Sequence, residues 1–148
     1  GLGMKVNYTS NRDNVILVLT ELGRTALKET AKIVRKDAKK RVKAQSEDTG
    51  NLRKNIATWV KKKGPEGPHL QIGVYDKARA QRKGLRYAYY AHFIEFGTSK
   101  QAAKPFLRPS VMENIEEIRR KQAEIIPEIE NEDRARALID ESEEETND

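Results

Sequence analysis

Residues 87–111 read YAYYAHFIEFGTSKQAAKPFLRPSV, and the fold prediction starts from this stretch. Tyr89, Phe93 and Phe96 recur at i, i+4 and i+7, which is the spacing of one helical face. Gly97 can adopt a positive φ, so the stretch is expected to open with a short helix that ends there. Because six of the nine aromatic residues lie in this stretch, we expect the packing centre here.

Polar residues in the same stretch predict its internal contacts. Glu95 lies in the last turn of the predicted helix, where the helix dipole disfavours a negative charge. Arg108 is the candidate cation that compensates it. Thr98 is expected to hydrogen-bond within the turn that follows Gly97.

Two prolines frame the last apolar residues of the stretch. Pro105 and Pro109 are expected to stiffen the segment that carries Phe106 and Leu107 into the core. Ser110 and Glu113 then form the pattern of a capping box at the start of a C-terminal helix. The buried stripe of that helix, which should stop or kink before Pro127, is predicted to be Val111, Ile115, Ile118 and Ile125.

Upstream of this stretch the sequence predicts an antiparallel β-sheet. Residues 53–62 partly alternate between apolar and polar, and residues 69–75 alternate cleanly. The Gly-Pro-rich residues 64–68 between them indicate a turn, so the pair forms a hairpin. Residues 4–9 are expected to add a third strand, and the basic residues 77–84 are expected to form a mobile loop.

A long amphipathic helix is predicted over residues 13–44. Its apolar positions recur mostly at steps of three or four: Val15, Leu19, Leu22, Ala26, Val34, Ala38 and Val42. A continuous helix of this extent is roughly 50 Å long, whereas a compact chain of this size is about 35 to 40 Å across. The helix must then protrude, bend or pack on another subunit. The predicted fold class is α+β: a long N-terminal amphipathic helix on a small antiparallel sheet, a short aromatic helix and a C-terminal helix.

Charge divides the 148-residue chain unequally. The net charge of +6 is the sum of +15 over residues 1–109 and −9 over residues 110–148. Either the basic part meets a polyanion, or the acidic end packs against a basic surface on the same or a neighbouring chain. Residues 140–148 include six acids and no apolar side chain, so they are expected to be a disordered tail.

Several classes of protein and site are excluded or disfavoured by composition. The longest apolar runs are five residues, too short for a membrane span or a secretory signal, so we expect a cytoplasmic location. The absence of cysteine excludes disulfides and thiolate sites. Gly64 and Gly67 are each followed by a proline, and the Gly-Lys-Ser/Thr sequence that ends a P-loop is absent there. The two glycines therefore indicate a turn and not a phosphate-binding loop.

The sequence predicts neither a catalytic site nor a metal site. No serine motif accompanies His69 or His92, the only histidines. His92 and Glu95 are three residues apart and could share a helix face as metal ligands, but no third ligand is evident. We therefore expect a protein that is not an enzyme and has no cofactor.

Clusters of lysine and arginine are the candidate contacts with nucleic acid or another subunit. Such clusters release counterions from phosphates without reading sequence. The alternative is that these clusters form solvent-exposed surfaces to which the acidic C-terminal segment binds. The candidate contact residues are Lys39, Lys40, Lys43, Lys61, Lys62, Lys63, Arg79, Arg82 and Lys83.

The stretch quoted at the outset resembles the signature of phage head-to-tail joining proteins, the gene-product-ten-like family of HK-ninety-seven type phages. Members typically show a small-aromatic helix, then Glu-aromatic-Gly-Thr, a short loop, and Pro-Phe-Leu-Arg-Pro opening the last helix. The matching positions are Ala91, Phe93, Ile94, Glu95, Phe96, Gly97, Thr98, Pro105, Phe106, Leu107, Arg108 and Pro109.

A second block also resembles this family. Asp48 to Arg53 looks like the family's Thr-Gly-x-Leu-Arg step from long helix to hairpin, carried by Thr49, Gly50 and Leu52. The resemblance spans residues 4–126, which we expect to form one domain. Residues 127–148 look like an acidic extension, partly helical and then disordered.

The resemblance implies a structural virion protein in the neck of a tailed phage or prophage, assembled in the host bacterial cytoplasm. Its implied partners are further copies of itself in a ring, head-completion or connector proteins, and tail-terminator or tail-tube proteins. Passing DNA is a further non-specific contact, and no membrane is involved. The alternatives are a small basic nucleic-acid-binding protein from a mobile element and, on size and charge alone, a ribonuclease-type toxin.

Overall fold

The computed structural model describes residues 6–10, 15–20, 27–45, 50–61, 69–125 and 145–148. In chain order the elements are β1 (Val6–Ser10), β2 (Val15–Thr20), α1 (Leu27–Gln45), α2 (Asn51–Asn55), β3 (Ile56–Lys61), β4 (His69–Val74), α3 (Lys77–Arg82), α4 (Ala91–Phe96), α5 (Arg108–Met112), α6 (Ile115–Ile125) and β5 (Glu145–Thr146). None of the helices in these ranges is long and apolar enough to cross a membrane.

One antiparallel sheet in the order β1-β2-β4-β3-β5 forms the centre of the fold. The predicted hairpin is confirmed: β3 pairs with β4 from Ile56 opposite Val74 to Lys61 opposite His69. The predicted N-terminal strand is also present as β1, but it pairs with β2 rather than with the hairpin. The hairpin is therefore the inner part of a wider sheet.

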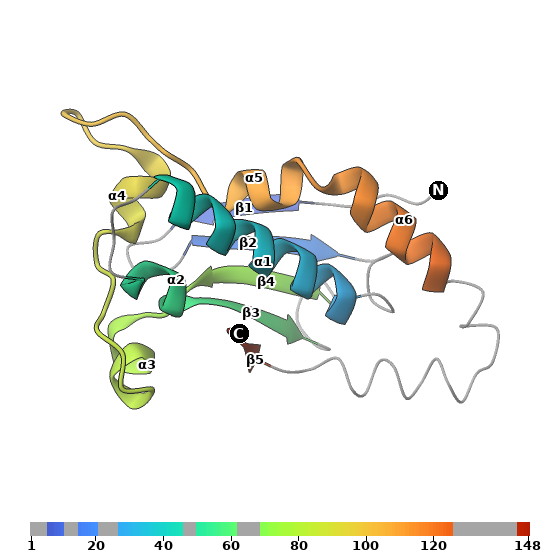
Figure 1. Cartoon of the computed structure of the whole chain (residues 1–148), viewed down its shortest axis with the longest axis horizontal. Coiled ribbons are helices and arrows are strands. Elements are labelled where there is room, and N and C mark those ends of the chain that lie inside the picture. The colour runs from blue at the N-terminus through green and yellow to red at the C-terminus, as the bar shows by residue number, and fades with distance from the viewer. Residues whose placement is uncertain (1–5, 11–14, 21–26, 46–49, 62–68, 126–144) are drawn as a thin grey trace.

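Helix α1 lies across one face of this sheet, with α5 and α6 along its side and α2, α3 and α4 gathered at one end (Figure 1). Its buried apolar residues are Leu27, Ala31, Val34, Ala38 and Val42. They pack in one cluster with sheet residues Ile56, Val60, Leu70, Ile72 and Val74 and with Phe106, Leu107, Val111 and Ile118 from the C-terminal part. This arrangement confirms the α+β class, with an amphipathic helix on an antiparallel sheet.

A second, smaller cluster lies on the other face of the hairpin. Alternation along β3 places Ala57 and Trp59 opposite the main core, where they pack with Tyr75 and Ala80. The Trp59 and Tyr75 rings meet edge to face with centroids 6.0 Å apart. Both faces of the central hairpin are thus covered.

The helix predicted over residues 13–44 is wrong in its first part. Val15–Thr20 is the strand β2, and the helix α1 occupies only Leu27–Gln45. Three of the first four β2 residues, Val15, Ile16 and Val18, are β-branched and favour a strand, although their spacing also suits a helix. Helix α1 is about 28 Å long and fits within a compact chain, so it does not need to protrude, bend or pack on a neighbour.

The start of the hairpin also differs from prediction. The strand expected over 53–62 begins at Ile56, because Asn51–Asn55 form the helix α2. The side chain of Asn55 closes this turn by donating through Nδ2 to the backbone oxygens of Asn51, at 2.8 Å, and Arg86, at 3.1 Å. Asparagine side chains commonly compete for backbone groups in this way at element ends.

The loop predicted over 77–84 is wrong, because it contains the helix α3. The carboxylate of Asp76 accepts a hydrogen bond from the backbone N–H of Arg79 at 2.8 Å and caps the helix N-terminus. Ala80 is buried in the second cluster. The Asp76 cap and the buried Ala80 side chain hold the basic helix α3 in place.

The C-terminal helix is present, but it is divided into α5 and α6 at Glu113 and Asn114. The capping box is wrong: Ser110 lies inside α5 and donates its hydroxyl to the backbone oxygen of Leu107. Pro109 lies in the first turn of α5, where its missing N–H costs nothing.

Residues 145–148, expected to be disordered, pack on the body. Thr146 pairs with Thr58 and Glu145 with Trp59, which adds β5 to the β3 edge. Asp148 forms an ion pair with Arg35 of α1 at 3.0 Å. In this segment the acidic end meets the basic surface of its own chain, one of the two options left open by the charge pattern.

Some expectations lie outside the described residues. They are the turn at 64–68, the domain boundary near 126, the short helix and tail over 127–144, and the residues Thr49, Lys62 and Lys63.

Replacement of Leu70 tests the position of the core. Leu70 is fully buried in the inner strand β4, so Leu70→Ala is expected to lower the free energy of unfolding by about 2 to 5 kcal/mol. Met112→Ala is the control, because Met112 is 43% exposed and should change it by no more than about 0.5 kcal/mol. Urea titrations followed by circular dichroism give both values, and equal losses would contradict this packing.

Candidate interaction surface

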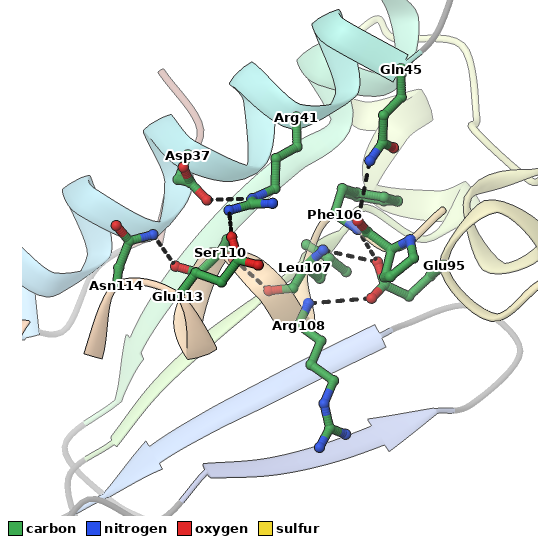
Figure 2. Close-up of polar contacts among 11 residues, drawn as sticks. Asp37, Arg41, Gln45, Glu95, Phe106, Leu107, Arg108, Ser110, Glu113 and Asn114 are labelled. Atoms are coloured by element: carbon green, nitrogen blue, oxygen red, sulfur yellow. Dashed lines mark hydrogen bonds and ion pairs between the residues drawn. The ribbon is translucent and has the colours of Figure 1, made fainter. Parts of the chain in front are cut away.

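The carboxylate of Glu95 joins the short helix α4 to the start of α5. It is 2% exposed and accepts hydrogen bonds from the backbone N–H groups of Phe106 and Leu107, both at 2.9 Å, and of Arg108, at 3.2 Å (Figure 2). Charged acceptors make stronger hydrogen bonds than neutral ones, particularly where water is excluded. We call this arrangement the Glu95 clamp.

The clamp corrects the predicted pairing of Glu95 with the Arg108 side chain. Figure 2 shows the Arg108 guanidinium extending away from Glu95, whereas the backbone N–H of Arg108 points at the carboxylate. Backbone N–H groups in succession carry partial positive charge and can hold an anion without a cationic side chain. The negative charge of Glu95 thus organises the backbone that leads into α5.

The loop between α4 and the clamp is closed by its own backbone. Gly97 ends α4 with φ 75° and ψ 177°, a conformation that is essentially restricted to glycine. The Thr98 hydroxyl accepts hydrogen bonds from the N–H groups of Lys100 and Gln101, which is the turn contact expected for it. The N–H of Lys104 donates to the carbonyl of Ile94 at 2.8 Å and returns the loop to the helix.

Phe106 and Leu107 of the signature anchor the clamp in the core. Phe106 and Leu107 are fully buried, and Leu52, from the second family-like block, is buried in the same cluster. Pro105 is half-buried, and its carbonyl accepts a hydrogen bond from Gln45 of α1 at 3.4 Å. The signature therefore supports the fold directly.

A salt bridge fixes α1 to the break between α5 and α6. Arg41 contacts Asp37 one turn earlier in α1 at 2.6 Å and also pairs with Glu113 (Figure 2). The Asn114 side chain donates to the Ser110 carbonyl at 2.8 Å beside it. These contacts position the C-terminal helices against α1.

The expectation that the aromatic stretch is the packing centre holds only in part. Phe106 is buried, but Tyr89 is 66% exposed and Phe93 is 47% exposed. Helix α4 has only six residues, and its buried members are Ala91 and Glu95. Tyr89 and Phe93 are therefore exposed, whereas Tyr90 and Phe96 are partly buried against the main cluster.

Six cationic side chains surround a hollow of about 580 Å³ beside α1 and α2, which we call the basic groove. Leu85, Gly50 and Asn147 complete its lining. Burial, followed by the neighbouring Arg35, lowers the pKa of Lys39, while Asp148 acts in the opposite direction. The cations are Lys36, Lys39, Lys40 and Lys43 from α1 and Arg53 and Lys54 from α2.

The structure divides the predicted basic residues into two groups. Lys39, Lys40 and Lys43 line the basic groove, whereas the α3 group lies elsewhere. There, Arg79 lies 5.2 Å from the centroid of the Trp59 ring, and Lys83 lies at the same distance from that of Tyr75. Arg82 is exposed and Lys61 is half-buried at the end of β3.

Sequence reasoning missed three groove residues, Lys36, Arg53 and Lys54. Lys36 precedes Lys39, Lys40 and Lys43 by three, four and seven positions, so its helical spacing could have placed it on their face. Arg53 and Lys54 carry no such signal, because the α1–α2 packing brings them there. Gly50, with φ 95°, begins that turn.

No group of three potential metal ligands occurs among the residues that the structure describes. His92, considered as a ligand beside Glu95, lies against Phe96 with ring centroids 5.0 Å apart. The Glu95 carboxylate is occupied by backbone N–H groups. The geometry at this point is that of a structural site.

Comparison with known proteins gives one family. The family model described as "Bacteriophage HK97-gp10, putative tail-component" matches residues 18–97, more than half of the chain. The match runs from β2 through α1, the hairpin and α4 to Gly97. No curated protein and no solved structure matches the chain.

Removal of the Glu95 charge tests the clamp. Glu95→Gln places an amide group among backbone N–H donors and is expected to lower the free energy of unfolding by about 1 to 3 kcal/mol. Amide hydrogen exchange at Phe106 and Leu107 should be faster in this variant than in the wild type. Glu124→Gln, on an exposed ion pair, is the control, and an equally small effect of both changes would contradict the clamp.

Gly97 and Gly84 offer a matched pair of substitutions. Both have positive φ, but a Cβ at Gly97 would lie 2.7 Å from the backbone N of Ala103, whereas no atom of the described residues lies within 4 Å of one at Gly84. Thermal unfolding should show a loss of about 3 kcal/mol or more for Gly97→Ala and about 1 kcal/mol for Gly84→Ala. The same loss at both positions would show that the loop is not packed as described.

Proposed function

The chain belongs to the HK97-gp10-like family of phage tail components, and we propose that it forms part of the ring that joins the head of a tailed phage to its tail. The family assignment makes it a structural component of the phage particle. The proposed place in the head-to-tail ring rests on two observations. One is the family match, and the other is the signature, which is held by the Glu95 clamp and continues beyond the matched residues to Pro109. The proposed location is the virion neck, assembled in the host bacterial cytoplasm.

The proposed partners are further copies of the chain and the proteins above and below the ring. In a closed head-to-tail ring each subunit presents different surfaces to its two neighbours. Head-completion or connector proteins would meet one side, and tail-terminator or tail-tube proteins the other. Residues 4–126 are the proposed ring-forming domain, and residues 127–148 are the proposed acidic extension.

The exposed aromatic residues around α4 are the proposed subunit contact. Both are large and exposed: Phe93 lies on α4, whose end is fixed by Gly97 and the Glu95 clamp, and Tyr89 lies in the turn just before this helix. Aromatic side chains on a rigid support lose little conformational entropy when a partner covers them. The role does not need catalytic chemistry, and we propose that the protein is not an enzyme.

Assembly can be measured directly. Light scattering of the protein alone, and mixed with the head-completion and tail-tube proteins of its own phage, is expected to show complexes of several copies. Tyr89→Ser/Phe93→Ser is expected to weaken assembly about tenfold or more while unfolding is unchanged. Met112→Ser is the control, because Met112 is exposed to a similar extent as Phe93 but lies on α5. A strict monomer at every concentration and with every partner would contradict the proposal.

A further inference from the structure

We infer that the basic groove is a binding site for the phosphate backbone of nucleic acid, and that residues Asn147 and Asp148 compete for its rim. The inference is independent of ring formation, because all groups involved belong to one chain. It assigns a ligand to the cations of α1 and α2 and a role to the acidic end.

The groove has the chemistry of a polyanion site. Six cations from two helices converge on one hollow, and none of the described residues that line it is acidic. Lys36, Lys40 and Lys43 are exposed, so their ammonium groups can reach phosphates without first breaking a buried contact. A lysine charge near phosphate gains mainly by counterion release, which is independent of sequence.

The rim of the groove is the side where its lining residue Lys39 adjoins Arg35, a buried residue of α1 that does not itself line the groove. This rim already holds oxygen acceptors from the chain itself. Lys39 donates a hydrogen bond to the backbone oxygen of Asn147. Arg35 pairs with the Asp148 carboxylate at 3.0 Å and donates to its backbone oxygen at 2.9 Å. Residues on this rim are therefore positioned to bind anionic oxygen, as a phosphate group would require.

The acidic end is held by a short strand and a few side-chain contacts. Its strand pairing involves only Thr146 and Glu145, and Lys83 pairs with Glu145 at 3.3 Å. In the ion pair of Arg35 with Asp148, the Arg35 side chain is 9% exposed and the Asp148 side chain is 84% exposed, so the aspartate is open to solvent. A phosphate group that approaches from solvent can exchange with the aspartate carboxylate on Arg35.

Duplex DNA fits the groove better than an acidic protein segment. The lysines at 36, 40 and 43 follow one face of α1 over two turns, so they present a line of point charges. A rigid duplex offers a continuous row of phosphates to such a line, and its binding does not require a flexible peptide to be ordered.

Titration of a labelled mixed-sequence DNA duplex into the full chain, followed by fluorescence anisotropy, tests the groove. If three phosphates are neutralised, affinity should fall about 40-fold between about 50 and 200 mM salt. Lys36→Gln/Lys40→Gln/Lys43→Gln should reduce the salt slope by about 3 and weaken binding at low salt. All three positions are exposed and glutamine keeps helix propensity, so the variant should fold.

The matched control removes three charges elsewhere. Lys77→Gln/Arg82→Gln/Lys100→Gln changes exposed residues that do not line the groove. It should retain most of the affinity. Equal losses for both triple variants, no binding by the wild type, or binding to polyglutamate but not to DNA would overturn the assignment.

A single substitution tests the competition. Asp148→Asn should tighten DNA binding by about threefold at low salt, because it removes the carboxylate that pairs with Arg35 and attracts Lys39, and so leaves more positive charge for phosphate. Glu124→Gln removes the same charge from α6 and should have no effect beyond net charge. Equal effects of the two changes would overturn the role assigned to residues 147 and 148, whether or not DNA binds.

Discussion

The structure depends on one buried negative charge. The Glu95 carboxylate, with its backbone donors at Phe106, Leu107 and Arg108, fixes where the chain re-enters the core after the loop that follows α4. Phe106 and Leu107 can fill the space between α1 and the sheet only because that re-entry point is fixed. Removing water from the carboxylate strengthens these hydrogen bonds and makes their loss costly. The position of α5 and α6, and the presentation of the aromatic residues around α4, follow from this constraint.

Local patterns predicted local structure well. The β3–β4 hairpin follows from alternation, and the end of α4 follows from Gly97, whose conformation only glycine adopts readily. Patterns that are compatible with both a helix and a strand led to wrong predictions. Residues 15–20 fit a helical face by spacing, but they also form a strand, and only pairing with β1 and β4 decides between the two. Helix α3 was missed because its cap, Asp76, is a single residue before a basic run.

The site was harder to predict because its partners are not sequence neighbours. Arg108 was chosen for Glu95 by charge, whereas backbone N–H groups, which no residue type reveals, perform that role. The basic groove likewise forms where α2 meets α1, so Arg53 joins Lys39 and Lys43 through tertiary packing alone. Charge counting located the basic body and the acidic end correctly. It did not show that residues 145–148 lie against α1 and β3 of their own chain.

We propose that this clamped fold is a ring subunit in the neck of a phage particle. The most direct measurement is electron microscopy of the purified protein mixed with the head-completion and tail-tube proteins of its own phage. We expect closed rings of one size, with a central opening wide enough for duplex DNA, seated between the two partners. Particles containing one copy only, or open chains that never close, would contradict it.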